Sequence, residues 1–504
     1  MGCCGSLECN RPPGRNHRVR FRKSLSIPNQ KMVRSLLHTA LPLLLIPVWA
    51  QIVLGAREDA ESLVRMKITL PAVVEVSIHT RGMRHWSFRN VYGNVIGLGN
   101  RIEDFSVTKT DGSTVKVENL TAGEFETTYD VNDYSYKVWL PSANSLSISH
   151  VSWLTPGYGF LMLADLLPQN ESPKLSLALT VPSKWTVETP LPVDQSQFIV
   201  SDAENSVLFV GSDLRKSSRQ IEGMNLELVV SGDWPFNQSK ILDVASKVMR
   251  SYFALTGFSL RDVSSVMIAP MPVSSSGTKW KAQTRGSSVV LAIDPQAKFP
   301  TWNGQLGVIF THELFHLWVP NSLKLVGDYD WFFEGFTLYQ ALLTAFDLKL
   351  ITLKEFLDTI ARVYDSYLSY PDNRSLLEES ETRWTTTGSL VYDKGMLLAF
   401  MYDLELRRKS NLHDHYSDIY GKLFDRFAGK PTNANQAIME LLGSFNEMRY
   451  FGKFIENANT LQLEHSLSEF GLDLDATGQR SNLKLKPQLT SDQKRLLHSF
   501  GFSH

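Results

Sequence analysis

Two histidines four positions apart have the spacing that a metal site needs. His312 and His316 lie in the sequence T-H-E-L-F-H, which has the pattern H-E-x-x-H with Glu313 after the first histidine. On a helix, residues at i and i+4 project from one face, so both imidazoles can bind one Zn²⁺ while Glu313 becomes a candidate general base. The stretch 304–318 is mostly apolar and contains no proline, which predicts a buried helix that ends before Pro320.

Glu334 is the candidate for a third ligand. The histidine motif also occurs by chance, and two histidines on an apolar helix can be hydrogen-bonded core residues. Glu334, however, lies in a second apolar, helix-like run that ends near Phe346, where a carboxylate is costly to bury unless it is paired or bound to a metal. Two histidines and one glutamate form the usual catalytic zinc set, with the fourth position open for water. The sequence therefore predicts a Zn²⁺ cofactor bound by His312, His316 and Glu334.

The segments H-E-L-F-H-L-W (312–318) and W-F-F-E-G-F-T-L-Y (331–339) resemble the gluzincin metallopeptidases, above all the glycyl aminopeptidase family. The resemblance implies an α+β multidomain chain, in which an N-terminal β-sandwich-like domain precedes a thermolysin-like, mainly helical zinc peptidase domain. It also implies the same three zinc ligands, with Glu313 as the catalytic base. Many members continue into a PDZ domain, which we expect this chain to lack.

A tyrosine further along extends the resemblance. The sequence Y-D-K-G at 392–395 resembles the gluzincin motif whose tyrosine donates its hydroxyl to the transition state. The resemblance thus implies that Tyr392 stabilises the oxyanion of the tetrahedral intermediate. By itself, the same residue is typical of the boundary of an amphipathic helix. Tyr339, Tyr364 and Lys394 are interpreted as structural. The leading hypothesis is a zinc metallopeptidase that hydrolyses peptide bonds with a zinc-activated water, acting as an aminopeptidase.

The substrate-binding candidates are Gln283 and Arg285. The resembling families carry a strand before the zinc helix with a glutamate that binds the free amine of the substrate, and by alignment Gln283 stands at that position. A neutral amide supplies no countercharge, and charge-assisted hydrogen bonds are roughly twice as strong as neutral ones. Arg285 is a candidate for binding a carboxylate, with a solvated edge-strand arginine as the plainer interpretation. The alternatives are therefore a zinc hydrolase without free-amine specificity, endopeptidase-like, and a non-catalytic peptide-binding protein.

Short alternating runs of apolar and polar residues fill 57–235 and predict the N-terminal β domain. Residues 236–480 are expected to form the catalytic domain, and 481–504 a C-terminal tail. A hairpin turn is expected at Asp111-Gly112. Strands are expected at 73–78, 146–149, 175–179, 226–230, 264–270 and 285–293. Helices are expected at 240–255, 347–370, 388–408, 413–427 and 435–442.

Residues 1–56 carry targeting signals. The sequence M-G-C-C-G-S at the start matches the N-myristoylation pattern with neighbouring palmitoylation candidates. A basic stretch (11–34) followed by a Leu-rich apolar run (36–56) predicts a secretory signal peptide instead, with a retained membrane anchor as the alternative. We expect export, periplasmic or secreted, with cleavage after Ala50 or Ala56. Translation from Met32 would give a compact signal peptide, a hypothesis that N-terminal sequencing of the mature protein would test.

The charge balance and the cysteines limit the partners. Lysine and arginine number 51 against 52 aspartates and glutamates, so the chain has no global basic field for nucleic acid. All three cysteines lie in the first ten residues, so a metal in the body of the chain must be bound by nitrogen and oxygen. The expected partner is a peptide or protein substrate. We expect membrane contact only through an uncleaved N-terminal segment or lipidation, and the sequence does not indicate an oligomeric state.

Overall fold

The computed structural model describes residues 62–502, apart from the segments 93–94, 110, 143–147, 173, 261–262, 273–279, 296–303, 372, 384–389 and 446–450. The predicted signal peptide or anchor, the lipidation motif and the alternative start at Met32 lie outside the described residues. Within the described residues, no helix is both long and apolar enough to cross a lipid bilayer.

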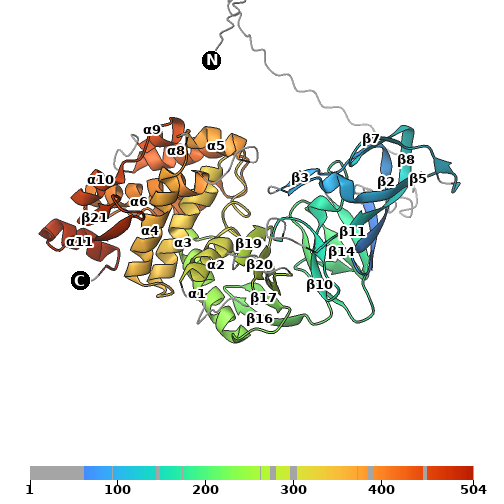
Figure 1. Ribbon diagram of the computed structural model, residues 1–504, viewed down its shortest axis with the longest axis horizontal. Coiled ribbons are helices and arrows are strands. Elements are labelled where there is room, and N and C mark those ends of the chain that lie inside the picture. The colour runs from blue at the N-terminus through green and yellow to red at the C-terminus, as the bar shows by residue number, and fades with distance from the viewer. Residues whose placement is uncertain are drawn as a thin grey trace, which may run out of the picture. The chain divides into compact units, whose positions relative to one another are not determined.

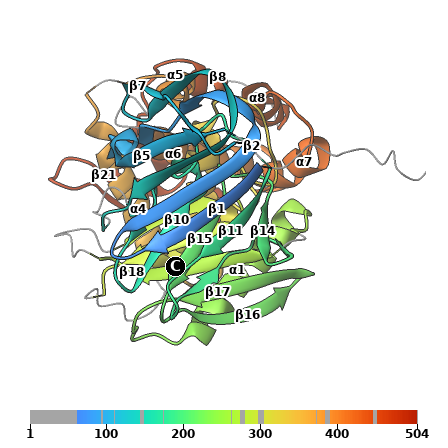
Figure 2. The same ribbon diagram turned by 90° about the vertical axis from the view of Figure 1, so that its right-hand side faces the viewer.

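A nine-stranded sheet forms the first part of the described chain (Figure 2). Its order is β13-β14-β11-β1-β2-β8-β5-β6, with β7 paired to β8. Along β2, Val74, Val76 and Ile78 are buried while Ser77 and His79 are exposed, because successive side chains of a strand point to opposite faces. The strands are β1 (Ser62–Thr69), β2 (Val73–Ser87), β5 (Ile102–Thr108), β6 (Thr114–Val115), β7 (Glu118–Thr121), β8 (Glu124–Trp139), β11 (Leu175–Thr180), β13 (Val193–Asp194) and β14 (Gln197–Val200).

A four-stranded sheet packs on the buried face of the first. Its order is β12 (Thr186–Glu188), β15 (Val207–Gly211), β10 (Tyr158–Met162) and β9 (Trp153–Leu154). Leu161 and Leu208 of this sheet share one apolar core with Val64 and Val76 of the larger sheet. The predicted N-terminal β domain is therefore present, and its two sheets face each other as in a sandwich. Smaller elements are β3 (Val91–Tyr92), β4 (Val95–Ile96), η1 (Leu98–Arg101) and η2 (Leu163–Asp165).

Two local predictions in this domain have different outcomes. The turn at Asp111-Gly112 is confirmed: Gly112 has a positive φ of 81°, and Asp111 Oδ1 accepts a hydrogen bond of 2.9 Å from the Ser113 backbone N–H. The strand expected at 146–149 is wrong for its described part, because Ile148 lies in a turn. That turn is fixed by a 2.8 Å hydrogen bond from the Trp153 indole to the Ile148 carbonyl.

A five-stranded sheet follows, in the order β16-β17-β18-β20-β19. The strands are β16 (Arg215–Ile221), β17 (Met224–Val230), β18 (Ser264–Pro270), β19 (Trp280–Arg285) and β20 (Ser288–Ile293). The three central strands run parallel and β16 and β19 are antiparallel edges. The expected strand 285–293 is thus two strands joined at Gly286, whose φ is 51°. The segment 226–230, assigned from the sequence to the β domain, belongs to this sheet.

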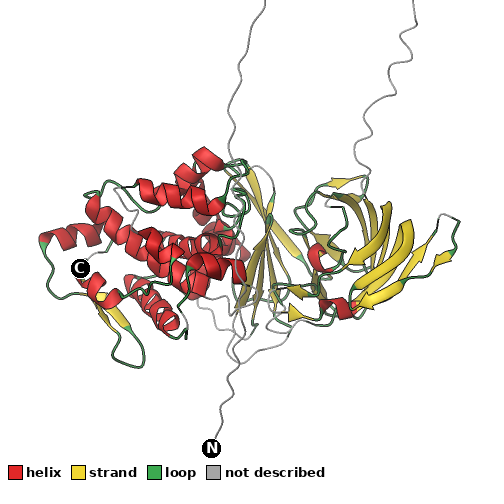
Figure 3. Cartoon of the chain, turned by 90° about the horizontal axis from the view of Figure 1, so that it is seen from above, coloured by secondary structure: helices red, strands yellow, loops and turns green. Residues whose placement is uncertain are grey.

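Both faces of this sheet are covered, as its continuous apolar strands require. Met267 and Val290 pack against Phe160 and Phe209 of the four-stranded sheet. The side chains on the opposite face of the five-stranded sheet belong to the apolar core that the helices form. Figure 3 shows the helices on one side of this sheet and the strands of the β domain on the other side.

The helices of the second part of the chain are shown in Figure 1. They begin and end where local capping sets their limits. In α1, Asn237 accepts a hydrogen bond from the Ser239 backbone N–H, and Gly257 ends the helix with a φ of 63°. In α4, a capping box formed by Thr352 and Glu355 starts the helix later than the sequence predicted. The larger helices are α1 (Gln238–Thr256), α2 (Gln305–Phe315), α3 (Thr337–Asp347), α4 (Leu353–Leu368), α6 (Leu390–Lys409), α7 (Asp418–Phe427) and α8 (Ala434–Ser444). Shorter ones are α5 (Leu376–Thr382), α9 (Gly452–Glu456), α10 (Leu463–Glu469) and α11 (Ser491–Ser499).

The last residues are part of the helical core, which differs from the tail expected at 481–504. The strand β22 (Asn482–Leu485) pairs with β21 (Leu472–Asp475), and α11 buries Leu496 and Leu497. Phe502 packs against Phe346 and Phe356. The apolar positions of this segment are too few to show a helical period, which explains why the sequence did not reveal it.

Candidate active site

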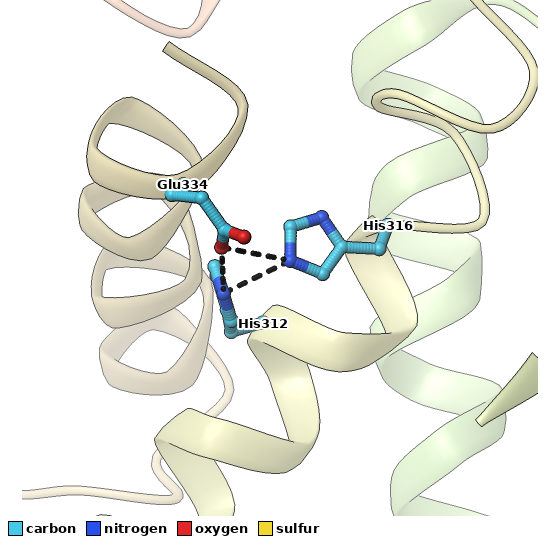
Figure 4. Close-up of side chains that lie close together, drawn as sticks. All are labelled: His312, His316 and Glu334. Atoms are coloured by element: carbon cyan, nitrogen blue, oxygen red, sulfur yellow. Dashed lines mark hydrogen bonds and ion pairs between the residues drawn. The ribbon is translucent and has the colours of Figure 1, made fainter. Parts of the chain in front are cut away.

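The two histidines of the motif come from the end of α2 and from the residue that caps it. His312 lies in the last turn of α2 and His316 is its C-cap residue, so both imidazoles project from one side of the helix (Figure 4). They are 4% and 7% exposed. The helix is held from behind by Tyr252 of α1, whose hydroxyl donates a 3.0 Å hydrogen bond to the Thr311 carbonyl. The core thus fixes the direction in which both histidines point.

Glu334 faces the histidines from η3 (Trp331–Phe336), a turn of π-helix that continues into α3. π-Helical turns are rare and occur frequently at functional sites. Next to Glu334, the Cα of Gly335 lies so close to α6 that an added Cβ would meet the Val391 carbonyl at 2.4 Å. Only glycine fits such an approach of two backbones. The close contact holds the segment of Glu334 against the start of α6, where Tyr392 lies.

The three candidate ligand atoms converge at distances that fit a zinc ion. His312 Nε2 and His316 Nε2 are 3.0 Å apart, and each lies 3.3 Å from Glu334 Oε2. Tetrahedral ligands with zinc bonds of 2.0–2.2 Å are about 3.4 Å from one another. Among the described residues, this trio is the group of His, Cys, Asp and Glu side chains that could bind a metal. The donor set and its spacing therefore fit the predicted cofactor.

Hydrogen bonds behind the ligands orient them. His316 Nδ1 lies 2.8 Å from the Val319 carbonyl, which can only accept a hydrogen bond. Nδ1 therefore carries the proton, and Nε2 has the free lone pair that can bind a metal. His312 Nδ1 lies 3.5 Å from the Thr337 hydroxyl. In this arrangement the lone pairs of two imidazoles and one carboxylate point at a common centre, which favours a cation there.

Arg383 links the third ligand to Tyr392. Its Nη2 donates to Glu334 Oε1 at 2.9 Å and to the Tyr392 hydroxyl at 2.6 Å, and Nη1 donates to Asp330. Since Arg383 occupies Oε1 of Glu334, the other oxygen, Oε2, is the one that faces both histidines. Arg383 could not be predicted, because it belongs to no motif and its role depends on the fold.

Burial and the charges of the site shift the pKa values of Glu334 and Tyr392. Burial would raise the pKa of Glu334, but Arg383 and His316 hold it well below its usual range. Burial raises the pKa of Tyr392 well above its ordinary value, and Glu334 adds to this while Arg383 opposes it. Tyr392 is therefore a protonated phenol at neutral pH, able to donate a hydrogen bond.

Glu313 is held by a residue that the sequence analysis did not single out. The Thr284 hydroxyl, on β19, lies 2.7 Å from Glu313 Oε2 and 2.7 Å from the Glu313 carbonyl. Glu313 is 7% exposed and sits in the helix turn between the two histidines. Thr284 therefore joins the edge strand of the sheet to the candidate base.

The two substrate-binding candidates have different surroundings. Gln283 is partly exposed, and its Oε1 lies 2.6 Å from His150 Nδ1 in the β domain. Arg285 is only 3% exposed, so the interpretation as a solvated edge-strand arginine is wrong. Its guanidinium donates to the His150 carbonyl at 2.6 Å and lies 4.4 Å from the ring centre of Tyr92. These contacts make Arg285 a link between the sheet and the β domain, and its assignment to a substrate carboxylate stays a prediction.

The other polar candidates have structural partners. Lys394 is fully buried and donates to the Arg374 carbonyl at 2.7 Å. Tyr339 donates to Asp403 at 2.9 Å. Tyr364 is buried, and burial raises its pKa to a value at which it stays protonated. The structure thus agrees with the structural interpretation of these three residues.

A cavity of about 270 Å³ adjoins α2 one turn before His312. Val308 and Ile309 of α2 form one wall, and Leu338 of α3 and Met396 of α6 lie opposite. Polar groups at this cavity include Asp393, whose carboxylate accepts a 2.6 Å hydrogen bond from Ser366. The lining is mostly apolar, as in pockets that bind small apolar groups.

Comparison with known proteins identifies the fold. No protein-family model matches the sequence, and no curated protein does. The chain is similar to the crystal structure of an aminopeptidase N family protein from Idiomarina loihiensis, with a TM-score of 0.69 at 17% identity over 82% of this chain and 79% of that one. It is similar to an M1 zinc metallopeptidase from Deinococcus radiodurans, a mutant bound to the substrate Tyr-Ser-Ala, with a TM-score of 0.53 at 14% identity over 80% of this chain and 95% of that one. The chain therefore has the fold of these two proteins, with an N-terminal β domain followed by a helical part.

Proposed function

We propose that this protein is a zinc-dependent metallopeptidase that hydrolyses peptide bonds. The observation that carries the proposal is the convergence of His312 Nε2, His316 Nε2 and Glu334 Oε2 within 3.3 Å of one another, with Glu313 beside them. A non-catalytic binding protein on the same fold would have no chemical need for Glu313 or for its hydrogen bond from Thr284. The likeness to M1 zinc metallopeptidases supports the same reaction class.

His312, His316 and Glu334 would hold the Zn²⁺, which as a Lewis acid polarises the scissile carbonyl and lowers the pKa of a water molecule. Glu313 is placed to take the proton of the attacking water and to pass it to the leaving nitrogen. The Thr284 hydroxyl, 2.7 Å from Glu313 Oε2, keeps the carboxylate turned toward the site. Because Glu313 is buried, few other groups can compete for that proton.

Tyr392 is assigned the stabilisation of the oxyanion. Its hydroxyl oxygen accepts a hydrogen bond from Arg383, and its hydroxyl proton is within hydrogen-bonding reach of Glu334, from which it would turn to the developing oxyanion. The arginine's positive charge also makes that proton a better donor. A preorganised donor of this kind is typically worth 10²- to 10³-fold in kcat. The apolar cavity next to Ile309 would take a side chain of the bound peptide.

The test combines metal analysis with one isosteric substitution. Purified protein should contain one zinc per chain, lose peptide cleavage with a chelator and regain it when Zn²⁺ is added. Glu313→Gln should keep the zinc, because Glu313 is not a ligand, and should lower kcat by about 10²- to 10⁴-fold. Glu118→Gln, on the exposed strand β7, is the matched control and should leave kcat unchanged. Unchanged turnover in Glu313→Gln would remove Glu313 from the mechanism, and zinc-loaded protein that cleaves no peptide would refute the proposed function.

A further inference from the structure

Gln283 precedes the residue that binds the candidate base and is in contact with the β domain. The residue follows Ala282 on β19, the edge strand of the five-stranded sheet, and precedes Thr284, which binds Glu313. Because successive side chains of a strand alternate, Gln283 projects from the face opposite to Thr284. There it meets His150, with 2.6 Å between Gln283 Oε1 and His150 Nδ1. The pair is one residue along the strand from the group that holds Glu313.

The direction of this hydrogen bond determines what the pair can bind. An amide oxygen only accepts, so His150 Nδ1 carries the proton and donates to Gln283 Oε1. The Gln283 amide nitrogen, with two N–H donors, has no partner among the residues that the structure describes. A substrate group at this position therefore meets donors from Gln283. An ammonium group consists of donors and needs acceptors, whereas a carbonyl oxygen is the partner that these N–H groups fit.

The charges around the pair oppose an ammonium group as well. Lys281 and Arg285 lie two residues before and after Gln283 and so share its face of the strand. Burial, with Arg285, Lys281 and Arg383 adding to it and the hydrogen bond to Gln283 opposing it, lowers the pKa of His150 to about 4, so the imidazole is neutral at pH 7. The acidic residue next to Arg285, Glu204, is paired with Arg89 at 2.6 Å. On this face of the strand, which is opposite to the face of Thr284 and Glu313, an incoming cation would thus meet cations and a neutral pair.

We propose that Gln283, held by His150, binds the carbonyl oxygen of an acylated α-nitrogen, so that the substrate is an internal peptide bond or an N-acylated peptide and not a free N-terminus. This inference rests on the proposed peptidase function and specifies its substrate class. It favours the endopeptidase-like alternative over the aminopeptidase hypothesis.

Three peptides with the same scissile bond test the inference. The first has a free amine one residue before that bond, the second is its N-acetylated form, and the third extends it by two residues on the amino side. We expect kcat/KM for the second and third peptides to exceed that for the first by about 10-fold or more, since a charged group loses its hydration without a charged partner. A difference between the second and third would distinguish a short acyl cap from a longer chain. Preference for the free amine would overturn the inference while leaving the peptidase intact; cleavage of no peptide by zinc-loaded protein would instead refute the function on which it rests.

Gln283→Glu adds a negative charge with almost no change in shape. We expect the ratio of kcat/KM for acetylated over free peptide to fall by about 10-fold or more, because the carboxylate supplies a charge-assisted partner for the ammonium. Gln462→Glu, on the exposed surface, is the matched control and should leave the ratio unchanged. Calorimetric binding of the same peptides to zinc-loaded Glu313→Gln protein gives a readout that does not depend on turnover. A ratio that does not move in Gln283→Glu would show that Gln283 does not face the substrate.

Discussion

Replacing Arg383 by methionine should weaken catalysis through Tyr392. Arg383 contacts Asp330, Glu334 and Tyr392 at once, and all but Tyr392 are at most 8% exposed. Removing one partner of a buried ion pair costs about 3–5 kcal/mol, since a charge is left uncompensated. The substitution is therefore best made in an Asp330→Asn background, which removes that charge beforehand and keeps the protein folded. Zn²⁺ still compensates the other carboxylate, Glu334.

The remaining loss of activity comes from removing the 2.6 Å hydrogen bond between Arg383 and the Tyr392 hydroxyl. A hydrogen bond to a charged group contributes about 1.5–3 kcal/mol. If the whole of this energy acts in the transition state, kcat/KM falls by about 10- to 150-fold. The loss should stay below that of Tyr392→Phe, because removing the donor itself costs about 10²- to 10³-fold.

The assay is a double-mutant cycle on kcat/KM, with zinc content measured for each protein. Asp330→Asn is the reference, and Arg383→Met, Tyr392→Phe and their combination are added to it. If Arg383 acts by holding Tyr392, the combination should be no slower than Tyr392→Phe alone. Losses that multiply would refute the reasoning, because they would show that Arg383 supports turnover independently of the tyrosine. A loss of zinc in Arg383→Met would place its role at Glu334 instead.

Two further predictions test the supports of the site. Gly395→Ala would bring a Cβ to 2.7 Å from the Trp331 carbonyl. We expect thermal melting to show a loss of about 1–3 kcal/mol in the free energy of unfolding, together with a lower kcat. Gly157→Ala is the control and should change neither, because an added Cβ there meets no atom within 4 Å. His150 has a pKa of about 4 in the folded chain against an ordinary 6.5, so the unfolded state takes up the proton first and stability falls as the pH drops from 6.5 toward 4. Because of this group, the free energy of unfolding should be about 2 kcal/mol lower at pH 5 than at pH 7. Urea unfolding should show this part of the pH dependence in the unsubstituted chain and not in His150→Gln.

The metal ligands could be predicted from the sequence because their geometry is largely local. His312 and His316 lie on one helix, where the spacing of four residues fixes their relative direction. Glu334 was predictable for a different reason, since a carboxylate in an apolar run needs a partner. Tyr392 depended on a resemblance, and the structure places its hydroxyl one hydrogen bond from the arginine that binds Glu334.

The predictions that were wrong depend on contacts between distant segments. The alternating pattern of 226–230 predicts a strand correctly, but periodicity carries no information about which sheet the strand joins, and β17 pairs with β16 and β18. Arg285 resembles any basic residue on an edge strand until His150, 135 positions away, accepts its hydrogen bond. Thr284 and Arg383 follow no motif, so the groups that hold Glu313 and Glu334 emerged only from the fold.

The site is built from two units that the metal ligands join. Glu334, Arg383 and Tyr392 form one unit, because Gly335 and Gly395 bring η3 and α6 into backbone contact. Glu313, His312 and His316 form the other, because they share α2 and are tied through Thr284 to the sheet. Direct ligand contacts between the units are those of Glu334 Oε2 with the two histidines. A bound cation would therefore fix the distance between the candidate base and the oxyanion donor, so that the three ligands set the catalytic geometry as well as holding the ion.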